Sequence, residues 1–90
     1  MNKARRKTIA ELRERLDALK AQADDLESEI ETIRDEEQEY FDNMPESLQG
    51  GDKGQAAEEA VSHLDTALDA IQEVVSQAEA ASDALESAAQ

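Results

Sequence analysis

Apolar residues recur at alternating intervals of three and four along the first half of the chain. The series defines heptad positions a and d, with Ile9 at a, and only Glu37 in it is polar. Its members are Ile9, Leu12, Leu16, Leu19, Ala23, Leu26, Ile30, Ile33, Glu37, Tyr40 and Met44. This spacing is typical of a helix that packs in coiled-coil fashion. It predicts a helix over about residues 4–43 with a narrow a/d seam.

The second half repeats the spacing with a broader apolar stripe. Positions a and d run from Ala57 to Ala89, and only Ser82 among them is polar. Position g adds a row of small residues, which are Ala60, Ala67, Val74, Ala81 and Ala88. Three apolar positions per heptad are expected of a helix with more than one neighbour. The pattern predicts a second helix over about residues 55–88.

The connection between the two halves, residues 44–54, breaks the helical pattern. It contains Pro45, which disfavours a helical conformation at Met44, and all three glycines of the chain. Asp52 is the expected N-cap of the second helix, with Gln55 three residues on, and residues 45–48 leave room for one helical turn. Two helices of about 36 residues, each about 54 Å long, should then fold back on each other. Residues 1–90 are therefore predicted to be a single all-α domain, a long antiparallel helical hairpin that resembles a coiled coil.

Two registers of this hairpin satisfy the pattern. One pairs residues whose numbers sum to about 94, such as Ile33 with Val61. The other has sums near 101 and stacks Ala23 on Ala78, and a layer of two alanines would leave a void. The first register is therefore the preferred prediction.

A lone hairpin would leave the g row of the second helix exposed. We therefore expect a homodimer in which Ala60, Ala67, Val74, Ala81 and Ala88 meet their symmetry mates in a four-helix bundle. The alternative is that these alanines serve helix propensity alone.

Charge is distributed unevenly along the chain, whose net charge is −14. Residues 1–20 carry +4 and residues 21–90 carry −18. The basic start should pair with acidic residues near the end of the second helix, or else contact an acidic partner or nucleic acid through Lys3, Arg5, Arg6 and Lys7. The acidic body is either a solvated surface or a negative rod that binds a basic protein, in the extreme as a mimic of DNA. The candidate partner-binding carboxylates are Asp24, Asp25, Glu27, Glu29 and Glu31.

The only aromatic residues, Tyr40 and Phe41, lie at the end of the first helix. With Met44 and Leu48 they are expected to form a cluster that closes the hairpin. Phe41 and Leu48 are also candidate anchors for a partner at the tip.

Few residues offer catalytic chemistry. The chain has no Cys, and its one His, His63, occupies a solvent-facing c position. No apolar stretch reaches the length of about 18 residues needed to span a membrane. Duplex DNA binding by the protein itself is disfavoured by its negative charge. We therefore expect a protein that is not an enzyme, with no catalytic residues, metal or cofactor.

The segment from Asp35 to Gln49, followed by a Gly/Lys turn and Ala57-Glu-Glu-Ala60, resembles small acidic two-helix proteins of phages and prophages. No settled activity is attached to that group. The resemblance implies a location in the cytoplasm of a bacterial host and interference with a host or defence protein. The expected function is thus a small acidic interaction protein. The alternative is a structural oligomerisation module with no dedicated ligand.

Overall fold

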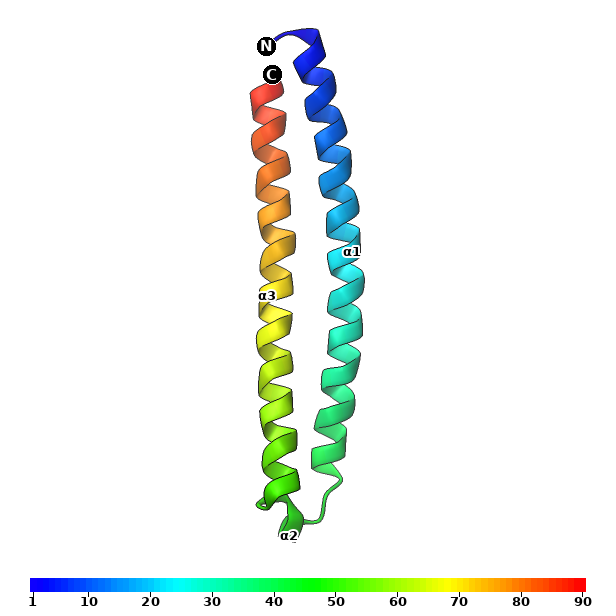
Figure 1. Ribbon diagram of the computed structural model, residues 1–90, viewed down its shortest axis with the longest axis vertical. Coiled ribbons are helices and arrows are strands. Elements are labelled where there is room, and N and C mark those ends of the chain that lie inside the picture. The colour runs from blue at the N-terminus through cyan, green and yellow to red at the C-terminus, as the bar shows by residue number, and fades with distance from the viewer.

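The computed structural model describes all 90 residues and consists of three helices in a rod of 69 × 15 × 13 Å (Figure 1). Helix α1 spans Lys3–Asp42, the short helix α2 spans Glu46–Gln49, and α3 spans Asp52–Ala89. Helices α1 and α3 run antiparallel, so both termini lie at one end and α2 lies at the other. The predicted all-α hairpin is confirmed, with helix boundaries within three residues of those expected from the sequence.

Local hydrogen bonds define the ends of the long helices. Helix α1 begins after Asn2, whose Oδ1 accepts a hydrogen bond of 2.8 Å from the amide of Arg5. The N-cap of α3 lies one residue before the expected Asp52, because Gly51 occupies that position and its carbonyl accepts from the amide of Gln55 at 2.9 Å. The prediction that Asp52 is the N-cap is therefore wrong. Asp52 lies in the first turn, where its carboxylate still complements the helix dipole.

The connection at the tip is tightly packed around Gly54. This glycine is buried, and a Cβ atom built on it would lie 1.9 Å from the carbonyl oxygen of Gln49. The absence of a side chain at residue 54 thus allows α2 to pack directly on the first turn of α3. Gln49 in turn donates from Nε2 to the carbonyls of Phe41 (3.1 Å) and Met44 (3.3 Å), at the C-terminal end of α1. These bonds tie α2 to the end of α1, where the Phe41 carbonyl also accepts from the amide of Met44 (3.1 Å).

The hairpin has a thin core. Only seven of the 90 residues are buried, and no large side chain is fully buried. The most enclosed apolar residues include the small Ala23, Ala57 and Ala78, with exposed fractions of 3%, 1% and 4%. Small side chains at these places allow α1 and α3 to approach closely.

Helix α1 presents positions a and e to α3, rather than a and d. Ile9 and Ala23 at position a are buried, and the position-e residues Arg13, Lys20 and Arg34 are half-buried. Every position-d residue is instead exposed, with fractions of 37–52%, namely Leu12, Leu19, Leu26, Ile33 and Tyr40. The prediction of an a/d seam is therefore wrong for α1, whose d positions lie at the edge of the contact.

The position-e side chains lie inward because they bond to α3. Arg13 donates from Nε to Ser82 Oγ (3.1 Å) and its Nη2 contacts Glu86 Oε2 (3.3 Å). The other contacts along this flank are Lys20 with Glu79 (2.9 Å), Arg34 with Asp65 (3.1 Å) and Gln72 with Glu27 (3.1 Å). We call this row of contacts the polar flank.

The residue numbers of these contacts can be compared with the two registers considered from the sequence. Arg13 and Ser82 have residue numbers that sum to 95, and so do Arg6 and Ala89, which are also hydrogen-bonded. The numbers of the remaining polar-flank pairs sum to 99. One sum, 95, lies beside the preferred value near 94, and the other, 99, lies beside the alternative near 101. Because long side chains reach along the rod, these contacts do not select one register, and the preference for the first stays a prediction.

Candidate interaction surfaces

Two ion pairs on the polar flank have distinct electrostatic character. Lys20 Nζ lies 2.9 Å from Glu79 Oε1, and this hydrogen bond, with the nearby charges of Asp17 and Asp24, raises the pKa of Lys20 above its usual value. Arg34 contacts both Asp65 and Asp35. Its Nε lies 2.9 Å from Asp35 Oδ1, but the N–H is not directed at that oxygen, so this second contact is electrostatic and not a hydrogen bond.

The polar flank also explains Ser82, the one polar residue of the second apolar stripe. Its side chain is buried, with 8% exposed, and its hydroxyl accepts from Arg13. The sequence pattern shows that Ser82 is an exception, but the partner becomes evident only once the register is known.

The five candidate carboxylates do not form one surface. Asp24, Asp25, Glu29 and Glu31 are exposed. Glu27 is half-buried and its Oε1 accepts from Gln72, so it belongs to the polar flank, and its assignment to the outer surface is wrong.

Most of the acidic side chains have no cation beside them. The chain has 23 Asp and Glu residues, and only Asp35, Asp65, Glu79 and Glu86 have a basic nitrogen within 4.0 Å. The other nineteen carboxylates form no ion pair within the chain. The rod therefore has a strongly negative outer surface.

An apolar face lies on the side of the hairpin opposite the polar flank. It consists of the position-d residues of α1 and the position-g residues of α3, which are Leu12, Leu19, Leu26, Ile33, Tyr40, Ala60, Ala67, Val74, Ala81 and Ala88. The two rows meet around a shallow open hollow, whose lining includes Leu19, Val74 and Ala81. A second hollow further along is lined by Leu12, Leu19 and Leu85, among others.

The g row of α3, the predicted dimer contact, is covered unevenly within the hairpin. Ala60 and Ala67 are half-buried, whereas Val74, Ala81 and Ala88 are exposed. Val74 has an exposed fraction of 40%. The row is thus open along its C-terminal half.

The tip cluster forms only in part. Phe41 and Met44 are half-buried, but Tyr40 and Leu48 are each 51% exposed. The predicted packing of Tyr40 in the core is wrong because its d position lies on the apolar face. The candidate anchors Phe41 and Leu48 therefore differ, and Leu48 is the more accessible.

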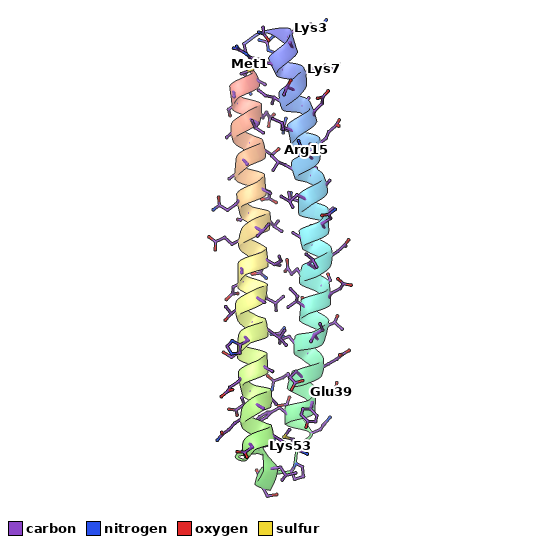
Figure 2. The ribbon with its side chains drawn as sticks, viewed as in Figure 1. Met1, Lys3, Lys7, Arg15, Glu39 and Lys53 are labelled. Carbon is purple, nitrogen blue, oxygen red and sulfur yellow. The ribbon has the colours of Figure 1, made fainter.

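In the basic N-terminal segment, Arg13 and Lys20 form ion pairs with α3, and the first four basic residues do not. Arg13 and Lys20 contact Glu86 and Glu79, as the sequence predicted for the two adjacent ends. Lys3, Arg5, Arg6 and Lys7 form no ion pair, although Arg6 Nε donates to the carbonyl of Ala89 at 3.0 Å. Figure 2 shows Lys3 and Lys7 at the end of the rod that carries the termini.

His63 is exposed, and no group of three or more His, Cys, Asp or Glu side chains is placed to hold a metal ion. None of the helices combines the length and the hydropathy that crossing a bilayer requires.

Comparisons with protein-family models, curated proteins and solved structures gave no match. The similarity to acidic phage and prophage proteins stays a prediction from the sequence.

Proposed function

We propose that the protein is a non-enzymatic interaction protein whose negative outer surface binds a basic protein. The observation that carries the proposal is the set of nineteen carboxylates that have no basic nitrogen within 4.0 Å. Charges of one sign on a rigid surface raise the rate of encounter with an oppositely charged partner. In a bacterial cytoplasm, basic proteins that bind nucleic acids are partners of the required charge. The phage or prophage setting that the sequence resemblance implies is part of the same proposal.

The site proposed for this partner is the exposed acidic cluster Asp24, Asp25, Glu29 and Glu31 on α1. These side chains lie within eight residues of one another, which is about 11 Å along the helix. Because they are exposed and none has a cation within 4.0 Å, a partner's lysines and arginines can reach them without breaking an ion pair of the hairpin.

The test is capture of proteins from a bacterial lysate on the immobilised chain, followed by elution with salt. The Debye length falls from about 10 Å at 0.1 M salt to about 3 Å at 1 M, so a charge-driven complex should dissociate in that range. We expect the eluted proteins to be predominantly basic, and duplex DNA to compete with the chain for them. An eluted set with no excess of basic proteins would contradict the proposal.

A matched pair of variants locates the surface. The first changes Asp24 and Asp25 to Asn and Glu29 and Glu31 to Gln, and the second neutralises four exposed carboxylates of α3, namely Glu58, Asp69, Glu73 and Asp83. Both variants remove the same charge, and neither touches the ion pairs. If the α1 cluster is the binding site, only the first should lose the captured proteins. Equal losses would mean that the net charge of the rod, and no particular cluster, provides the attraction.

A second function, that of an oligomerisation module, is favoured by the apolar face. A row of five exposed large side chains on α1 is unusual for a chain that acts alone, because exposed apolar patches commonly mark interaction sites.

A further inference from the structure

We infer that two copies of the chain associate antiparallel through their apolar faces, so that the terminal end of each lies beside the tip of the other. This inference concerns a surface different from the acidic cluster proposed above, and it holds or fails independently of that proposal. It also differs from the contact expected from the sequence, since it places the position-d residues of α1 in the interface together with the g row of α3.

The hairpin exposes more surface than a compact monomer of the same mass. A compact monomer of 9.9 kDa exposes about 5,200 Å² according to the scaling of surface with mass, whereas this chain exposes 6508 Å². The excess is about 1,300 Å² per chain, more than the roughly 800 Å² that each partner loses in a standard stable complex. A partner that covered about 800 Å² of this chain would thus leave it no more enclosed than a compact protein of its mass.

The apolar face has the composition of a buried interface. Its α1 row consists of Leu12, Leu19, Leu26, Ile33 and Tyr40, spaced seven residues apart and 37–52% exposed. The facing row of α3 is small, and the hollow between Leu19, Val74 and Ala81 is open. Large residues of one copy can enter the space above the small residues of the other, which is how layers of a four-helix bundle interdigitate.

The distribution of charge along the rod determines the orientation. Residues 1–20 have seven cations and three carboxylates, whereas residues 35–59, which form the tip, have nine carboxylates and one cation, Lys53. Figure 2 shows Lys3, Lys7 and Arg15 toward one end and Glu39 and Lys53 near the other. A parallel pair would bring two acidic tips together. An antiparallel pair brings each tip to the basic N-terminal segment of its partner, so fewer like charges face each other than in a parallel pair.

The first experiment measures mass in solution by sedimentation equilibrium or light scattering at micromolar concentration. We expect a dimer for the native chain and a monomer for the double variant Leu26→Gln/Ile33→Gln, because both side chains lie in the interface. The control is Ala21→Gln/Ser28→Gln, which adds the same amide groups to the outward face of α1 and should stay dimeric. Circular dichroism establishes that each variant is helical before its mass is interpreted.

Orientation is tested with spin labels, which need an introduced Cys because the chain has none. The sites are Glu11→Cys, Asp25→Cys and Glu39→Cys, which share heptad position c and lie fourteen residues apart. At 1.5 Å per residue, an antiparallel pair separates the labels at residues 11 and 39 from their mates by about 40 Å along the rod, while those at residue 25 lie close together. A parallel pair gives the same distance at all three sites.

Each result either supports or overturns the inference. A dimer that the Leu26/Ile33 variant dissociates, with distances shortest at residue 25, supports it. A native monomer, an assembly larger than two copies, a dimer unaffected by the Leu26/Ile33 change, or equal label distances overturns it. None of these outcomes bears on binding of a basic partner by the acidic cluster.

Discussion

At the scale of single residues, charged side chains determine which face of α1 points inward. Arg13, Lys20 and Arg34 have long side chains whose stems can cover apolar surface while their charged ends reach α3. Each finds an acceptor there, and Glu27 Oε1 in turn accepts from Gln72 Nε2. With these bonds formed, the position-d residues of α1 lie at the edge of the contact with α3.

The stability contributed by the Lys20–Glu79 pair is predicted to depend on pH. Because the hydrogen bond to Glu79 raises the pKa of Lys20, the pair contributes stability at neutral pH and up to the unfolded pKa of about 10.4, and this contribution is lost as the pH rises through the higher folded value. Glu79→Gln should lower the pKa of Lys20 toward its usual value, although Asp17 and Asp24 will keep part of the increase. NMR titration of the Lys20 Nζ or Cε resonance measures the pKa of Lys20 in both proteins. An unchanged midpoint in the variant would mean that the contact does not form in solution.

At the scale of elements, the tip depends on the packing of α2 against α3. Gly54→Ala places a methyl group 1.9 Å from the carbonyl oxygen of Gln49, so α2 must move. Overpacking of this kind costs about 1–3 kcal/mol, which exceeds or offsets the helix-propensity gain of about 1 kcal/mol at that position. We expect the NMR resonance of the Gln49 side-chain amide to shift as its bonds to Phe41 and Met44 are lost.

Gly50→Ala is the matched control for the tip. No atom lies within 4 Å of a Cβ placed at residue 50, and its φ of −82° suits any residue. This variant should be neutral or more stable by up to about 1 kcal/mol, with the Gln49 resonance unchanged. If both variants shift that resonance equally, the shift does not depend on a clash between residue 54 and α2, and the close packing of α2 on α3 does not require a glycine there.

The elements themselves were predictable, but their faces were not. The three-four spacing, Pro45 and the clustered glycines correctly give two long helices and a break. The spacing assigns Leu12, Leu19 and Leu26 to the seam. It gives no information on the ion pairs between α1 and α3, because these depend on a register that the sequence leaves open. The same uncertainty assigned Glu27 to the outer surface, whereas Asp24 and Asp25 were placed correctly because no partner draws them inward.

At the scale of the whole molecule, repulsion outweighs the ion pairs. The net charge is −14, and only four ion pairs form. In each pair the carboxylate is at least half exposed, and such pairs contribute about 0–1 kcal/mol. The folded rod holds its carboxylates closer together than the unfolded chain does, so their repulsion lowers the free energy of unfolding.

Added salt should therefore stabilise the protein. Raising NaCl from about 0.05 M to about 0.5 M shortens the Debye length below the spacing of most of these charges. Each gain of about 1 kcal/mol should raise Tm by about 4–8 °C for a domain of this size. Thermal unfolding followed by circular dichroism measures the effect, at fixed protein concentration because association also changes Tm.

A variant with less charge at the tip separates screening from a general strengthening of apolar burial by salt. Changing Glu36, Glu39, Glu46 and Glu58 to Gln removes four charges from the end where carboxylates are densest, and none of the four makes an ion pair. Its Tm should be higher than that of the native chain at low salt, and its increase with salt should be smaller. An equal increase in both proteins would show that salt acts on burial and not on repulsion. A fall in Tm of the native chain on adding salt would show that the ion pairs of the polar flank stabilise the fold by more than the repulsion destabilises it.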